Sequence, residues 1–115
     1  MSLSAKQQRF ALKAANLIVW INEHRGWAVT YGDAYRDPRT NGTFGVAKGY
    51  AAASSVHKLR LAIDLNLFID GKYITGDCPE YQEIGVQWES MDDDARWGGR
   101  WADFNHFSFE EMGVK

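Results

Sequence analysis

The chain has little cysteine and little proline. Cys78 is the only cysteine among 115 residues, and there are two prolines. A lone thiol excludes an intramolecular disulfide, and "GDCPEYQ" offers no nearby CxxC or histidine partner, so we interpret Cys78 as a structural thiol. The fold must therefore depend on its own hydrophobic core. A chain of this length can build one such core, which predicts a single domain over residues 1–115.

Long hydrophobic runs are also missing. The longest apolar run near the N-terminus is "LIVWI", far short of the roughly 20 residues that a membrane-spanning helix needs. The N-terminal segment has no signal-peptide pattern of basic, apolar and small residues. The sequence thus predicts no membrane insertion and a protein that is cytoplasmic as synthesised.

No charge of one sign dominates. The chain carries 13 basic and 15 acidic residues, for a net charge of -2, and the basic residues are scattered. Because nucleic-acid binding needs a basic stripe or patch, we expect no nucleic-acid partner. Five Trp, five Tyr and six Phe instead predict a compact globular protein, as a monomer or small oligomer.

Hydrophobic spacing and turn residues predict an α+β domain with a small antiparallel sheet flanked by helices. Ser4 is the expected N-cap of the first helix, and Gly26 its stop. The expected elements are a helix over 4–25, a strand in "GWAVTYG", a long functional loop over 33–50, a hairpin through Asp70-Gly71, a helix over 78–91, a loop in "DDDARWGGRW" and a last strand in "NHFSFE".

The segment from Leu59 to Phe68 alternates strictly between aliphatic residues and others. This period of two is typical of a strand with one buried face. The odd positions would build the core. Asp64 and Arg60 would then share the opposite face of the sheet.

Two of the three histidines suggest a metal site. His24 ends the first helix and needs no role beyond a favourable cation there. His57 precedes the alternating strand, and His106 begins the last one, so both could meet Asp64. Two imidazoles and a carboxylate form a known zinc ligand set that leaves a position open for water. An odd separation from Asp64 requires His57 to lie outside the regular strand.

Asp103 lies three residues before His106. A carboxylate beside a metal site can take a proton from water and pass it to a leaving amine, so Asp103 is the candidate general base and acid. The same four residues also suit a fold without chemistry. In that reading the histidines are hydrogen-bonded at strand ends, and Arg60 and Asp64 form a surface ion pair.

Three segments resemble one peptidase family. "SVHKLRLAID" is similar to the Ser-x-His and Ala-x-Asp signature of the D-alanyl-D-alanine carboxypeptidase-like zinc peptidases, which include phage endolysin L-alanyl-D-glutamate peptidases. "WGGRWADFNHF" resembles their second signature, and "GDAYRDP" the loop that holds a substrate-binding arginine. The matches follow the family's order and span most of the chain.

The resemblance implies a fold shared with hedgehog-like peptidases and a zinc site on the sheet face. It implies that His57, Asp64 and His106 bind Zn²⁺ and that Asp103 is the acid and base. Arg36 would be the second catalytic residue and would steady the scissile carbonyl or a substrate carboxylate. Residues with a substrate-binding or supporting role would be Ser55, which supports the metal loop, Arg60 and the neighbouring Tyr35. Arg60 stands where many members have glycine, and it could narrow the substrate pocket or supply a second carboxylate contact. The resemblance therefore leaves open which bond is cut.

The expected function is hydrolysis of a stem-peptide bond in bacterial peptidoglycan, of the endolysin type, after release from the cytoplasm to the cell wall. A D,D-carboxypeptidase or a D-Ala-D-Ala dipeptidase is the alternative within the enzyme class. A non-catalytic metal-containing wall-binding module is the alternative outside it, with Trp97, Trp101 and Tyr35 as its aromatic contact surface.

Overall fold

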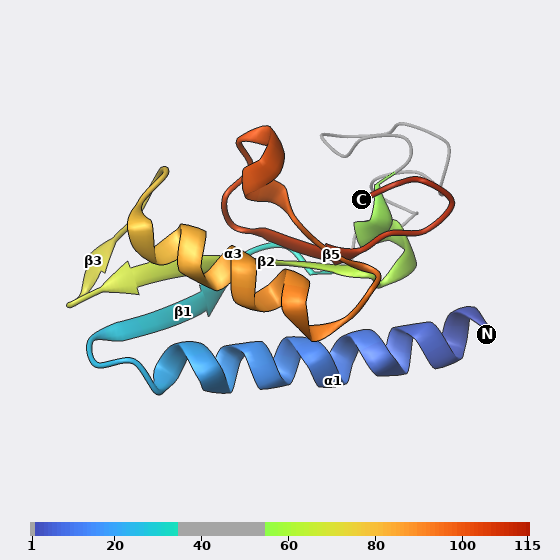
Figure 1. Ribbon diagram of the computed structural model, residues 1–115, viewed down its shortest axis with the longest axis horizontal. Helices are drawn as coiled ribbons and strands as arrows, with labels where there is room; N and C mark the ends of the chain where they lie inside the picture. Colours follow the sequence, from blue (N-terminus) through green and yellow to red (C-terminus); the bar gives the residue numbers. More distant parts are fainter. Residues whose placement is uncertain (1, 35–54) are drawn as a thin grey trace.

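The structure, a computed structural model, describes residues 2–34 and 55–115. The described residues form two α-helices, one antiparallel sheet and two short 3-10 helices (Figure 1). In chain order these are α1 (Leu3–Asn22), β1 (Trp27–Tyr31), η1 (Val56–Leu59), β2 (Ala62–Ile69), β3 (Lys72–Tyr73), α3 (Pro79–Met91), β4 (Ala95–Trp97), η2 (Gly98–Trp101) and β5 (His106–Phe109).

The sheet is built around β2. Its strands lie in the order β1-β2-β5-β4, and β3 forms a hairpin with β2. Asp70 and Gly71 both have positive φ in the hairpin turn, as a two-residue turn between twisted strands requires. All pairs are antiparallel, so the predicted α+β class with an antiparallel sheet and two helices is confirmed.

Both helices contribute to one hydrophobic core with the sheet. Phe10 of α1 makes edge-to-face contacts with Trp88 of α3 and with Phe109 of β5. Leu65 and Leu67, the fully buried residues of β2, lie at odd positions, and the odd-numbered Ile63 and Ile69 pack partly buried against the same core. Because side chains alternate along a strand, Asp64 projects from the face of the sheet that the core does not use.

The predicted boundaries need four corrections. Helix α1 ends at Asn22, with Glu23 as its C-cap, so it is shorter at this end than the predicted helix over 4–25. Helix α1 begins earlier than expected, because the hydroxyl of Ser2, not Ser4, accepts the N–H of Ala5. The predicted strand over 59–68 begins only at Ala62, since residues 56–59 form η1. Part of the predicted loop "DDDARWGGRW" is strand β4 and helix η2. The expected loop over 33–50 lies largely outside the described residues.

A charged corner joins the start of α1 to the segment after α3. Arg9 contacts the carboxylates of Asp92 at 2.7 Å and Asp94 at 2.6 Å. Lys6 pairs with Glu111 at 3.3 Å. Although burial raises the pKa of Asp92, the N–H of Asp94 and the guanidinium of Arg9 outweigh it and hold this pKa below its usual value.

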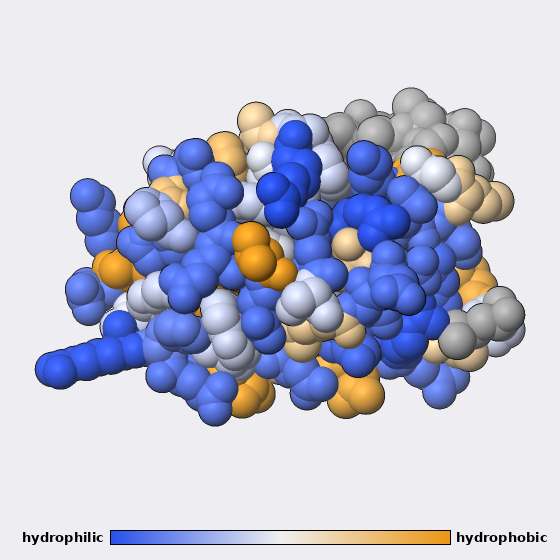
Figure 2. All heavy atoms as spheres, in the orientation of Figure 1, coloured by the Kyte–Doolittle hydropathy of each residue, from blue (hydrophilic) through white to orange (hydrophobic). Residues whose placement is uncertain are grey.

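Most of the molecular face in Figure 2 is hydrophilic, with apolar residues in separate small patches. The more exposed large hydrophobic residues include Leu12, Val19, Val86 and Met112. Such scattered exposure is ordinary for globular proteins. Within residues 2–34 and 55–115, neither helix combines the length and the apolar character that crossing a bilayer requires.

Candidate metal centre

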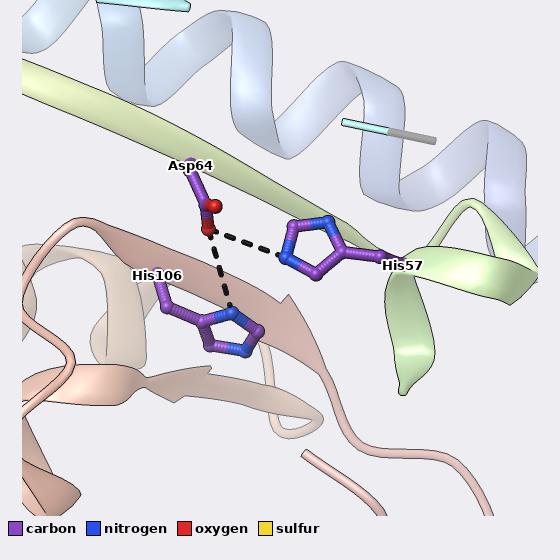
Figure 3. A group of neighbouring side chains, drawn as sticks. All are labelled: His57, Asp64 and His106. Atoms are coloured by element: carbon purple, nitrogen blue, oxygen red, sulfur yellow. Dashed lines mark ion pairs between the residues drawn. The ribbon is translucent and has the colours of Figure 1, made fainter. Parts of the chain in front are cut away.

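His57 reaches the sheet from outside it. It lies in η1, whose N-cap Ser55 accepts the His57 N–H at 3.2 Å. The odd separation between His57 and Asp64 would place them on opposite faces of one regular strand. Residues 56–59 form η1 and not the beginning of the strand. The His57 side chain therefore points toward Asp64 (Figure 3).

Asp64 and His106 are brought together by strand register. They are directly paired residues of β2 and β5, so their side chains leave the same face of the sheet. One Asp64 oxygen, Oδ1, lies 3.2 Å from His57 Nε2 and 3.6 Å from His106 Nδ1 (Figure 3). One donor atom from each of the three residues falls within 4.8 Å of the others.

Hydrogen bonds fix which nitrogen of each imidazole faces the cluster. His57 Nδ1 lies 2.8 Å from the carbonyl oxygen of Ala34, and His106 Nε2 lies 3.1 Å from that of Lys115. A backbone oxygen only accepts, so these nitrogens carry a hydrogen. The opposite nitrogen of each ring faces the Asp64 carboxylate. A hydrogen bond from the far nitrogen to a backbone oxygen is the kind that orients metal-ligating histidines.

One buried nitrogen of the cluster lacks a hydrogen-bond partner, and a cation could satisfy it. Nε2 of His57 is buried and makes no hydrogen bond among the described residues, although it lies close to Asp64. Buried polar atoms without partners are rare and costly, and a metal ion bound between the three residues would satisfy this nitrogen. The two imidazoles and one carboxylate thus fit Zn²⁺ in number, type and position.

Asp64 is held as a carboxylate. Burial raises its pKa, but the contacts with the His106 and His57 imidazoles outweigh burial and bring the pKa to about 2. An ionised oxygen between two imidazoles is the state that a metal ligand needs. The carboxylate therefore offers a negative charge to a cation at neutral pH.

Asp103 lies at the rim of the cluster. Its Oδ2 is 3.9 Å from His106 Nδ1, and about half of its side chain is exposed, at 52%. The backbone holds it there: its N–H donates to Gly98, and its carbonyl accepts from His106. Partial exposure beside the candidate ligand His106 suits a group that exchanges protons with water and substrate.

Two adjacent glycines shape this rim. A Cβ on Gly98 would lie 2.2 Å from the carbonyl oxygen of Asp103 and 2.6 Å from the Cβ of His106. A Cβ on Gly99 would enter the ring of Trp97, whose other side packs on Gly85 of α3. Trp97 also donates to the carbonyl of Phe104 at 2.9 Å. The Trp-Gly-Gly segment therefore lets Asp103 and His106 approach each other.

The remaining predicted site residues have different outcomes. Ser55 caps η1, a place from which it can support the first histidine. Arg60 is not on the Asp64 face, because it precedes β2, in a left-handed conformation that ends η1. It borders a groove of about 420 Å³ against α1, together with Gln7 and Ile63. Tyr35 and Arg36 lie outside the described residues.

The binding-module alternative predicts an aromatic contact surface that includes Trp97, and this part of the prediction is wrong. Trp97 is buried, at 1% exposure, so it is a core residue. Trp101 is 41% exposed and lies edge-on against His106, with the rings 5.6 Å apart. It remains a candidate contact residue beside the site.

Sequence reasoning missed the support given by Tyr81. Its hydroxyl donates to the carbonyl of Leu65 and accepts the N–H of Leu67, which follow Asp64 in β2. Burial raises the pKa of this hydroxyl to about 12, so it stays protonated and can donate. A tyrosine on an amphipathic helix carries no local signal of such a role, which depends on where α3 packs.

Comparison with known families agrees with the cluster. Residues 48–109, more than half of the chain, match the sequence profile of a family described as D-alanyl-D-alanine carboxypeptidase. Among curated proteins, none matches the chain significantly. The matched range contains His57, Asp64, Asp103 and His106. The chain belongs to the D-alanyl-D-alanine carboxypeptidase family of peptidases.

Proposed function

We propose that the protein is a zinc-dependent peptidase that hydrolyses a stem-peptide bond of bacterial peptidoglycan, of the endolysin L-alanyl-D-glutamate type, on the family's hedgehog-like fold. The convergence of His57, Asp64 and His106 beside Asp103 carries this proposal. Membership of a cell-wall peptidase family supports it.

His57 Nε2, Asp64 Oδ1 and His106 Nδ1 would hold the metal. Bound zinc supplies Lewis acidity, which lowers the pKa of water to about 7 and polarises the scissile carbonyl. The two imidazoles are oriented for this by the carbonyls of Ala34 and Lys115. Asp64 adds the negative charge that keeps a divalent cation in place.

Asp103 would move the proton. Its exposed carboxylate takes a proton from the attacking water and then delivers it to the departing nitrogen. The nitrogen therefore leaves as a neutral amine and not as an unstable amide anion. Arg36, which the family resemblance assigns to the carbonyl or to a substrate carboxylate, completes the proposed set. We further propose synthesis in the cytoplasm and action on the wall after release.

Mass spectrometry of digested peptidoglycan tests the proposal. Purified sacculi are incubated with the zinc-loaded protein, with a chelated sample alongside. We expect new stem-peptide fragments that disappear on chelation, and their masses identify the bond. Stoichiometric zinc without any fragments would contradict hydrolysis of the wall and favour the binding module.

Asp103→Asn separates metal binding from turnover. Asparagine keeps the size of the side chain but cannot accept the proton, so we expect turnover to fall by about 10²- to 10⁴-fold with zinc content unchanged. Zinc is measured by elemental analysis and turnover by release of new amino groups. The matched control is Asp93→Asn, at an exposed aspartate outside the site. Full activity of Asp103→Asn would remove Asp103 from the mechanism.

The family description itself favours one alternative, a D,D-carboxypeptidase or D-Ala-D-Ala dipeptidase. Such an enzyme acts on a substrate that ends at the residue it releases. Substrate size distinguishes the two: intact sacculi for the endolysin type, small soluble peptides for the dipeptidase. Rapid cleavage of D-Ala-D-Ala with inert sacculi would replace our proposal with this alternative.

A further inference from the structure

A small cleft opens on the Asp103 side of the metal centre. It has a volume of about 170 Å³. Its lining includes Tyr73, Thr75, Tyr81, Asp103, Phe104 and Asn105. Asp103 therefore borders both the cleft and the candidate ligand His106, so a molecule in the cleft would lie next to the reacting groups.

The cleft exists because β2 changes partner along one edge. Residues 68–69 of β2 pair with β3, whereas residues 62–64 pair with β5. Between them the hydroxyl of Tyr81 satisfies Leu65 and Leu67 in place of a strand. The two neighbouring segments, 73–75 and 102–105, line the gap together with Tyr81.

Asn105 is a rigid polar group in this wall. Its Nδ2 donates to Asn66 Oδ1 at 3.0 Å, and its backbone carbonyl accepts the N–H of Leu65 at 2.8 Å. Its own Oδ1 forms no hydrogen bond with the part of the chain that the structure describes, and it can accept from an amide N–H. Thr75, which carries a hydroxyl, also lines the cleft. Asp103 is the one charged residue among the described residues of the lining.

Covalent geometry fixes how close the α-carboxyl group of the leaving amino acid comes to the Asp103 carboxylate. To protonate the amine, Asp103 must approach it to about 3 Å. The α-carboxyl carbon of that amino acid lies about 2.5 Å from the same nitrogen. In the bound substrate, before Asp103 has taken a proton from water, a free α-carboxylate there would stand about 5 Å from the Asp103 carboxylate. The interaction would be unfavourable, whereas an amide would not be repelled.

We propose that this cleft binds the amino acid whose amine is released and that it selects a substrate in which the α-carboxyl group of this amino acid is an amide. Asn105 and Thr75 hold the amide, and Asp103 disfavours the free acid. The inference rests on the proposed peptidase function and refines its substrate. It predicts preference for an amidated D-glutamate over a free one, and for an internal bond over a C-terminal one.

Two matched peptide pairs test the selection. The first is N-acetyl-L-alanyl-γ-D-glutamyl-L-lysinamide with the α-carboxyl of D-glutamate either free or amidated. The second is N-acetyl-D-alanyl-D-alanine and its carboxamide. For the pair that is hydrolysed, we expect kcat/KM for the amide to be higher on the order of tenfold. Equal rates, or a faster free acid, would overturn the proposal.

A charge placed in the cleft should reverse this preference. Thr75→Lys puts a cation opposite Asp103, so hydrolysis of the free acid should rise relative to the amide. Thr75→Gln is the control of similar length without charge and should retain the preference. Asn105→Ala should raise KM for the amide severalfold with little change in kcat, whereas Asn22→Ala, at an exposed position on α1, should change neither. An unaltered ratio in Thr75→Lys would count against the cleft.

Binding distinguishes a failure of the cleft from a failure of the peptidase proposal. The same four peptides are titrated into the zinc-loaded protein while backbone amide resonances are followed by NMR. Shifts at residues 73–75 and 102–105 that are stronger with the amides support the cleft even if no peptide is cut. Shifts confined to other residues, or none, would overturn the cleft even if cleavage occurs.

Discussion

At the scale of single residues, Arg60 stands out because its backbone is left-handed, with φ of 55°. It ends η1 and precedes β2, so it sets the angle at which the strand leaves the segment that carries His57. This conformation costs a non-glycine residue about 1 kcal/mol, and only glycine adopts it freely.

Replacing Arg60 by glycine should stabilise the protein relative to replacing it by alanine. Both changes remove the same side-chain contacts, but only glycine relieves the left-handed backbone. We expect Arg60→Gly to unfold with a free energy about 1 kcal/mol higher than Arg60→Ala, as measured by urea denaturation. Equal stabilities would mean that the backbone at residue 60 carries no strain.

The site residues show how far sequence reasoning reaches at this scale. The position of two histidines beside predicted strands suggests His57, Asp64 and His106 as a metal site, the resemblance to the family implies the same ligands, and the structure brings these three together. Their roles as ligands remain predictions. Arg60 was assigned to the wrong place because strand parity was extended into a segment that is helical. Asn105 and Tyr81 had no local pattern, since their roles depend on contacts between distant elements.

At the scale of elements, the charged corner formed by Arg9, Asp92 and Asp94 holds α1 against the segment that leads into β4. This segment continues into η2 and the rim of the site. The side chain of Asp92 is only 9% exposed, so its ion pair is less weakened by water than one on the open surface. The corner therefore anchors the strand that leads toward Asp103.

The corner should make stability depend on pH in the acid range. The pKa of Asp92 is lower in the folded state than in the unfolded chain, where it is near 4, so the unfolded state binds more protons between these values. Its contribution is complete above about pH 4 and is lost as pH falls through the folded pKa. Asp92→Asn should cost about 1 kcal/mol at pH 7 and progressively less below pH 4. Denaturant unfolding at several pH values checks this, and a constant difference would contradict it.

Long elements were predicted well and short ones poorly. The helices and the hairpin were found because apolar spacing and turn residues repeat over many positions. Strand β4 was missed because it has only three residues, and its pairing with β5 is decided by the core position of Trp97. The start of β2 was misplaced because Leu59 and Leu61 continue the alternation into a segment where the backbone turns.

At the scale of the whole molecule, three separate elements must be in place before the candidate ligands meet. His57 comes from η1, Asp64 from β2 and His106 from β5. A cation that binds this arrangement binds the folded state and not the unfolded chain. Metal binding is therefore linked to folding.

Zinc should raise the temperature of thermal unfolding of the metal-free protein. At a free concentration about 100 times its dissociation constant, zinc would add about 2.7 kcal/mol, a shift on the order of 10 °C for a domain of this size. His57→Ala and His106→Ala should each abolish the shift. His24→Ala should preserve it, because His24 stacks on Trp27 away from the cluster. A zinc-induced shift that survives His57→Ala would place the metal elsewhere.

The single cysteine leaves this chain without an intramolecular disulfide, and a metal ion in the candidate cluster would serve as a cross-link in its place. A cation held by His57 and His106 would close a loop of about 50 residues, a span for which a disulfide is worth about 4 kcal/mol through the entropy of the unfolded chain. Unlike a disulfide, this closure is independent of redox conditions and is released by a chelator. The susceptibility of the protein to proteases should therefore follow the availability of zinc.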